Sequence, residues 1–102
     1  MESVQQYASF IKRIFSAPPS IRKKLLLTSN KYIIKAIAEI ILNIYYKNIQ
    51  KKISTKSLTH MKRMKPAVLK IINASTGDAV RKELIVKHSE NFVCAIKDVL
   101  LL

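Results

Sequence analysis

The lysines and arginines are the residues of this chain whose number and spacing point to a function. The sequence has 19 lysines and arginines against 6 aspartates and glutamates, which gives a formal net charge of +13. Residues 3–77 contain 15 basic residues and one acid, Glu39, whereas residues 78–102 contain four of each. Each cation that neutralises a phosphate releases a counterion, so an excess of this size favours a polyanion as partner. The first three-quarters of the chain is therefore predicted to carry a polyanion-binding surface.

Nine basic residues are the candidates for contact with nucleic acid. They lie in a short helix, in a polar connection and in the helix that follows: Arg22, Lys23, Lys24, Lys51, Lys52, Lys56, Lys62, Arg63 and Lys65. Lysine outnumbers arginine by 15 to 4, and arginine is the residue that reads guanine bidentately. Aromatic residues do not interleave with the basic runs, which argues against a platform for single strands. We therefore expect neutralisation of phosphates on double-stranded DNA, or another polyanion, without base readout.

The residue types that enzymes use are scarce. The chain has two histidines, one cysteine and no HExxH, CxxC or glycine-rich phosphate loop. We interpret His60 as part of a basic helix face and His88 as a helix-end residue rather than as metal ligands. The sequence predicts a protein that is not an enzyme and that uses no metal or cofactor.

A stretch from Asn30 to Gln50 organises the predicted fold. Its polar positions recur every four residues and almost everything between them is apolar: Lys31, Lys35, Glu39, Asn43 and Lys47. This spacing indicates a helix at about residues 30–49, of about five turns, with one polar ridge and an otherwise apolar circumference. Charges in its middle argue against a membrane span. We expect Glu39 to be structural and to pair with Lys35.

Other helices must enclose this central one. Apolar spacing predicts them at residues 4–15, at 21–28 after the paired prolines with Ser20 as N-cap, and from a cap at Ser54 or Thr55 to about residue 72, with Pro66 as a kink or restart. An Asp78-capped helix with a Val80 and Leu84 stripe and an apolar C-terminal helix follow, separated by a break or loosened turn at residues 89–91. The predicted fold is a compact all-α single-domain bundle, residues 1–102, of about five or six helices.

The last helix is the most apolar part of the C-terminal quarter. We expect it to dock on the core or on a second copy of the chain, which makes a homo-oligomer possible. Cys94 lies within it in the apolar run 92–96 and is predicted to be a buried structural thiol.

The order of basic and apolar groups also resembles a known family. The motif residues are Arg22-Lys23-Lys24-Leu25-Leu26, Ile37, Glu39-Ile40, Asn43-Ile44, Leu58, Lys62-Arg63, Lys65, Arg81-Lys82 and Leu84. This pattern is similar to that of small basic proteins from Polinton or Maverick-type elements and adintovirus-like DNA viruses. The resemblance implies a structural protein of a virus or mobile element.

Charge and resemblance together favour a non-specific DNA-binding protein that condenses or packages a viral or virus-like genome. A membrane-active cationic protein is one alternative, in which residues 4–15 insert into anionic lipid through Phe10, Ile11, Ile14 and Phe15. A virion structural or oligomerisation module is another. The expected location is the nucleus of a host cell or a virion, in a reducing intracellular compartment. Secretion is not expected, since Lys12 and Arg13 interrupt the apolar residues near the N-terminus.

Overall fold

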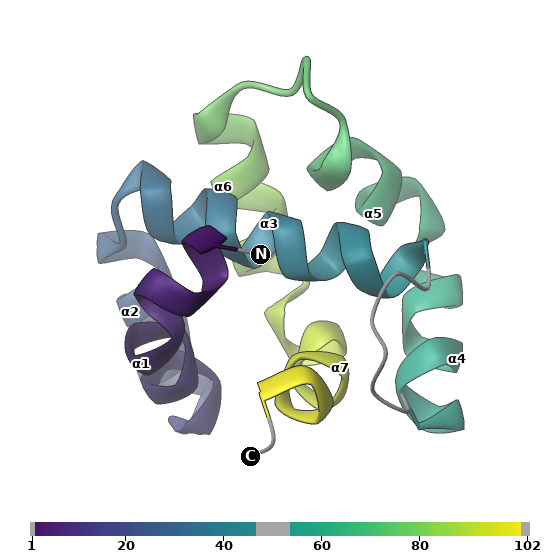
Figure 1. The fold of residues 1–102 in the computed structure, drawn as a ribbon, viewed down its shortest axis with the longest axis horizontal. Helices are drawn as coiled ribbons and strands as arrows, with labels where there is room; N and C mark the ends of the chain where they lie inside the picture. The colour runs from purple at the N-terminus through teal and green to yellow at the C-terminus, as the bar shows by residue number, and fades with distance from the viewer. Residues whose placement is uncertain (1, 47–53, 101–102) are drawn as a thin grey trace.

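Seven helices make up the part of the chain that the structure describes. A computed structural model describes residues 2–46 and 54–100, and these residues contain no strand. The helices are α1 (Glu2–Ser16), α2 (Pro19–Thr28), α3 (Lys31–Tyr45), α4 (Thr55–Arg63), α5 (Lys65–Ile72), α6 (Asp78–Lys87) and α7 (Ser89–Leu100). The predicted all-α fold is confirmed (Figure 1). The helix number exceeds the predicted five or six because α4 and α5 are separate helices, as are α6 and α7.

Helix α3 is the centre of the fold, as its sequence predicts. Its isoleucines and alanines are buried, whereas Lys35 is exposed and Glu39 and Asn43 are half-buried on the predicted ridge. The Asn30 side chain caps the helix by accepting hydrogen bonds from the N–H groups of residues 32 and 33, both at 3.0 Å. Helices α1, α5, α6 and α7 pack around it. These contacts give one compact domain with extents of 30 × 29 × 26 Å.

The central helix ends earlier than predicted. It finishes at Tyr45, and Tyr46 is its C-cap, with a backbone N–H that donates to the Leu42 carbonyl. Burial of an apolar face supplies most of the stability of such a helix, and among the described residues of this segment Ile44 is the last buried one, since Tyr45 is half-buried and Tyr46 is exposed. The predicted last turn, including Lys47, lies outside the described residues.

Helices α1 and α2 form one side of the molecule. Helix α1 buries Ile11, Ile14 and Phe15 against α3. Helix α2 begins two residues before its predicted start, with Pro18 rather than Ser20 as N-cap, since Pro19 fits a first helical turn that needs no N–H donor. The two prolines therefore end one helix and start the next.

The segment after residue 54 forms two helices joined at Met64. Pro66 lies in the first turn of α5, so it marks a restart rather than a kink within one helix. The Ser54 hydroxyl caps α4 by accepting from the Ser57 N–H at 3.2 Å, as predicted. The Asp98 carboxylate of α7 accepts hydrogen bonds from the Ser57 hydroxyl at 2.8 Å and from the Ser54 N–H at 3.1 Å. The N-terminus of α4 is thus fixed to α7.

Helix α6 is rotated from the predicted orientation. Val80 is 41% exposed and Arg81 only 8%, whereas the sequence favoured Val80 as a core residue. The Arg81 guanidinium donates to the carbonyls of Ile71 at 2.8 Å and Asn73 at 2.9 Å, which lie at the C-terminal end of α5. Helix ends leave carbonyls without intrahelical partners, and this arginine satisfies two of them. The N-cap of α6 is Gly77 rather than the predicted Asp78.

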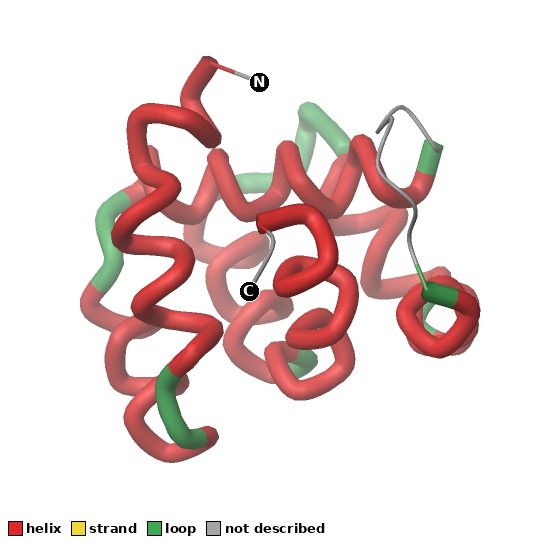
Figure 2. Tube along the Cα trace, turned by 60° about the horizontal axis from the view of Figure 1, so that its bottom comes forward, coloured by secondary structure: helices red, strands yellow, loops and turns green. Residues whose placement is uncertain are grey.

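The C-terminal helix docks on the core. Phe92, Ala95, Ile96, Val99 and Leu100 are buried, and α7 packs against α1, α3 and α4. Figure 2 shows α7 between α1 and α4. An oligomer would have to use other residues, because this apolar face is occupied within the chain. Cys94 is only half-buried, against the prediction, because it lies off that face.

Candidate nucleic-acid interface

Arg22 does not belong to the nucleic-acid surface that its sequence position predicts. Only 5% of the residue is exposed. Its Nη1 lies 2.7 Å from Oε1 of Glu90, and its Nη2 donates to the Ala17 carbonyl at 2.7 Å. A buried guanidinium that is held by a carboxylate and by a backbone carbonyl is not available to phosphates, so the structure corrects this assignment.

Lys23 and Lys24 are exposed on α2, at one side of the molecule. Helix α2 packs on α1 and α6, whereas α4 packs on α5 and α7, and Figure 1 places α2 and α4 toward opposite ends of α3. At a rise of 1.5 Å per residue, the 15 residues of α3 span about 22 Å. The structure therefore does not bring the α2 lysines beside the basic residues of α4.

The remaining described candidates share the solvent side of two consecutive helices. Ser57 and Met61 face inward from α4, and helical spacing puts the exposed cations on the opposite side of that helix. We call these exposed residues the α4–α5 basic face: Lys56, Lys62, Arg63, Lys65 and Lys70. Lys51 and Lys52 lie outside the described residues. Lys70, on α5, was not among the predicted residues.

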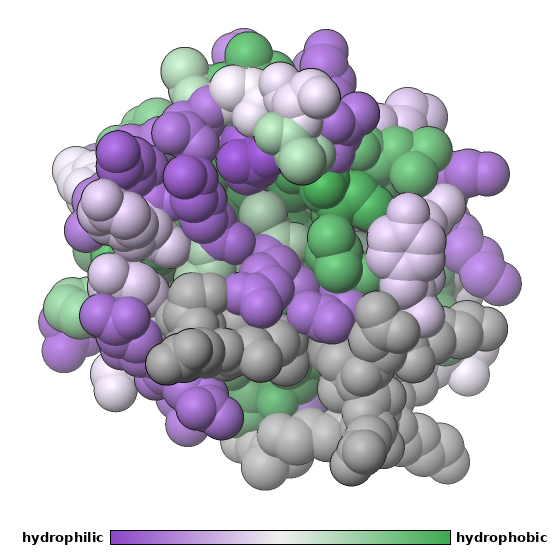
Figure 3. All heavy atoms as spheres, turned by 45° about the horizontal axis from the view of Figure 1, so that its top comes forward, coloured by the Kyte–Doolittle hydropathy of each residue, from purple (hydrophilic) through white to green (hydrophobic). Residues whose placement is uncertain are grey.

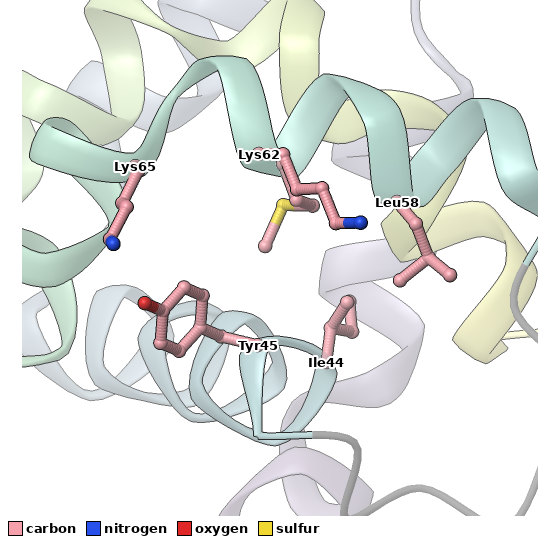
Figure 4. Close-up of a pocket in the computed structure, with 6 residues that line it drawn as sticks. Ile44, Tyr45, Leu58, Lys62 and Lys65 are labelled. Carbon is pink, nitrogen blue, oxygen red and sulfur yellow. The ribbon is translucent and has the colours of Figure 1, made fainter.

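A pocket of about 450 Å³ adjoins the α4–α5 basic face. Ile44, Tyr45, Leu58 and Met61 supply most of its wall, with Lys62 and Lys65 at its edge. Figure 4 shows both lysine side chains directed from α4 and the start of α5 toward the C-terminal end of α3. Unpaired carbonyls give a helix C-terminus partial negative charge, which favours cations there. The C-terminal end of α3 therefore favours the positive charges of Lys62 and Lys65 at this position.

A second hollow of about 390 Å³ lies between α5 and the end of α6. Arg63 and Lys70 line it together with Leu84 and His88. Burial and the neighbouring charge of Lys87 lower the pKa of His88 below its usual 6.5. His88 is therefore neutral at pH 7 and adds no charge to the α4–α5 basic face.

Three acids of the C-terminal quarter have partners in the fold. Glu90 pairs with Arg22, Asp78 lies 3.4 Å from Arg81, and Asp98 accepts from the cap of α4. Burial alone would raise the pKa of Asp98, but hydrogen bonds from the Ser57 hydroxyl and from the N–H and side chain of Ser54 lower it overall. Glu90 and Asp98 thus connect α7 to other helices, whereas Asp78 pairs within α6.

Sequence reasoning did not select two further exposed cations, Lys12 and Arg13 of α1. Both lie off the apolar stripe of α1, and that pattern was the available signal. Helices α1 and α2 pack together, so these residues belong to the same end of the fold as Lys23 and Lys24. We call the four residues the α1–α2 basic face. Figure 3 shows hydrophilic residues at the left and right of one face of the molecule and across its centre, around a patch of hydrophobic surface.

No protein-family model, curated protein or solved structure matches the chain. Within residues 2–46 and 54–100, no group of three or more His, Cys, Asp or Glu side chains is placed to hold a metal ion. None of the helices in those ranges is both long and apolar enough to cross a membrane.

Proposed function

We propose that this protein binds double-stranded DNA through its phosphates and without sequence preference, with the α4–α5 basic face as the principal contact. This proposal rests on the observation that five exposed cations lie on the solvent sides of two consecutive helices. The nearby Asp98 is held by the cap of α4. To bind a line of phosphates, a protein needs several cations on one surface whose charge is not neutralised by nearby acids.

The dimensions of the α4–α5 basic face suit a duplex. Helices α4 and α5 have 9 and 8 residues, which correspond to about 13 and 12 Å. A duplex carries one phosphate charge per about 1.7 Å of its axis, so several phosphates lie within reach of this face. Four of its five cations are lysines, which act as point charges and do not favour bidentate base contacts. The chemistry supports binding by charge neutralisation rather than base recognition.

The resemblance to proteins of Polinton or Maverick-type elements and adintovirus-like viruses supports a role in a virus or virus-like element. We propose that the protein condenses or packages the DNA of a virus or virus-like element, in the nucleus or the virion. A condensing protein must accept any sequence, because it covers a genome rather than a single site. Phosphate-directed binding meets that requirement.

A matched pair of charge reversals tests whether the α4–α5 basic face is an organised site. Lys56→Glu with Arg63→Glu changes the net charge by four units, as does the control Lys31→Glu with Lys87→Glu, and all four residues are exposed. We expect the first variant to lose at least about tenfold in affinity for a duplex in a fluorescence anisotropy titration and the control much less. Equal losses would show a bulk-charge effect with no organised site.

Salt dependence gives an independent measurement on the unmodified protein. Each phosphate contact contributes about −0.9 to the slope of log affinity against log salt, so about five contacts predict a slope between −4 and −5. Additional contacts would make the slope steeper. A slope shallower than about −2, or strong preference for one sequence, would contradict the proposed function.

A further inference from the structure

The two basic faces of the molecule are separate surfaces. Helices α1 and α2, which carry the α1–α2 basic face, and helices α4 and α5, which carry the α4–α5 basic face, lie toward opposite ends of α3 (Figure 1). The length of α3, about 22 Å, sets the scale of their separation. The Debye length at physiological ionic strength is about 8 Å. Phosphates bound at one face therefore leave the field of the other face largely unneutralised.

A straight duplex docked on the outer side of α4 and α5 does not reach the outer side of α1 and α2 at the other end of the molecule. The folded body measures 30 × 29 × 26 Å, so such a duplex would have to bend sharply around the body to touch both ends. DNA resists this, since its persistence length is about 150 bp. A second duplex is the polyanion that can occupy the free face without such bending.

Helix α7 holds the two faces at a fixed distance. Near its N-terminus, Glu90 pairs with Arg22 of α2, which carries half of the α1–α2 basic face. Near its C-terminus, Asp98 receives hydrogen bonds from the cap of α4, which carries most of the α4–α5 basic face. The two carboxylates are eight residues apart, or about 12 Å along the helix. The acids of α7 thus connect both basic faces to one rigid element.

We propose that one copy of this protein bridges two DNA duplexes, one on the α1–α2 basic face and one on the α4–α5 basic face. This inference rests on the proposed function and adds a mechanism of condensation to it. A protein with one basic face coats or neutralises DNA, whereas a protein with two separated faces also brings duplexes together. Bridging by a single copy needs no oligomer.

A co-capture experiment tests the bridge. One duplex of about 30 bp, well below the persistence length, is fixed to beads, and a fluorescent duplex of the same length is offered in solution with the protein. We expect the captured fluorescence to rise with protein concentration and to fall again in excess protein, where each duplex is covered separately. Anisotropy with a single duplex measures simple binding in parallel, and sedimentation shows whether the protein is monomeric at the concentrations used.

Two variants remove one face each. The first reverses Lys12, Arg13, Lys23 and Lys24 to Glu, and the second reverses Lys56, Lys62, Arg63 and Lys65 to Glu; each lowers the net charge by eight units, from +13 to +5. We expect each variant to bind a single duplex, with reduced affinity, and to lose co-capture at least about tenfold. A mixture of the two variants should not restore co-capture, because no molecule in it has both faces. The corresponding Gln variants provide the same test if a Glu variant does not fold.

The possible failures are distinguishable. If the unmodified protein does not bind a single duplex, the proposed function fails and bridging fails with it. If it binds one duplex but captures no second one, only bridging fails. Co-capture at the unmodified level by either variant, loss of all single-duplex binding in either variant, or rescue by the mixture would also overturn bridging by a single copy.

Discussion

The guanidinium of Arg22 lies 2.7 Å from the carboxylate of Glu90, 68 positions later in the sequence. The arginine side chain is 6% exposed and the glutamate side chain 52%. Glu90 is in the first turn of α7, where negative charge is favourable to the helix dipole. Because Arg22 also donates to the Ala17 carbonyl, this pair links the α1–α2 connection to the start of α7.

Glu90→Gln should destabilise the protein because it removes the charged partner of a buried cation. Glutamine keeps an acceptor oxygen and the Glu90 side chain is 52% exposed, so only the charge contribution is lost, and we expect the free energy of unfolding in urea to fall by about 1 kcal/mol. Glu83→Gln is the matched control, since Glu83 is an exposed acid on α6. Similar unfolding midpoints for the two variants would contradict a structural role for the Arg22 pair.

Arg81→Lys should weaken the junction of α5 and α6. The arginine donates through two different nitrogens to carbonyls of residues 71 and 73, a fork that an ammonium on a flexible stem does not reproduce. We expect a loss of about 1–3 kcal/mol in unfolding free energy at unchanged net charge. Lys87→Arg, on the exposed part of the same helix, is the control and should be near neutral. Equal stability of Arg81→Lys and the unmodified protein would show that the fork is dispensable.

Asp98 should make stability depend on pH in the acidic range. Its pKa in the folded protein lies below the ordinary 3.8, so the folded state binds fewer protons than the unfolded state between the two values. Stability from this group is therefore complete above the unfolded pKa and is lost as the pH falls through the folded one. Thermal melts below pH 4 should show a weaker acid dependence in Asp98→Asn than in the unmodified protein. An identical acid dependence would contradict this linkage.

Phe15 and Phe10 provide a matched pair of the same residue type on α1. Phe15 is 0% exposed and Phe10 is 54% exposed. Phe15→Ala should cost about 3–5 kcal/mol in unfolding free energy, since it leaves a cavity, whereas Phe10→Ala should cost less than about 1 kcal/mol. Chemical denaturation measures both values. Comparable costs would mean that α1 does not pack on α3 as described.

Helix α1 also provides a test that distinguishes DNA binding from membrane activity. Ile11, Ile14 and Phe15 are three of the four residues that the membrane-active alternative would insert into lipid, and they are buried in the core, whereas the fourth, Phe10, is 54% exposed. We therefore expect no leakage from anionic vesicles at protein concentrations that saturate DNA. Leakage that depends on these three residues would favour the alternative.

The sequence by itself determined the fold class and the central helix. Polar groups recur every four residues between Lys31 and Asn43, and on a helix this spacing places them on one side. The spacing correctly predicts which side of α3 is least covered by other helices. The Ser54 cap and the role of the paired prolines are equally local. Such features depend on residues within one turn of each other, so they are readable before any packing is known.

Tertiary structure decided which charges are available. Arg22 and Arg81 look like surface residues in sequence, because a charged side chain is rarely buried without a partner. Their partners, Glu90 and the carbonyls at the end of α5, come near them only when the helices pack. The same packing separates the α2 lysines from those of α4 (Figure 1). Helix periodicity fixes the direction of a side chain relative to its own axis, but only the arrangement of the axes determines what that side chain meets.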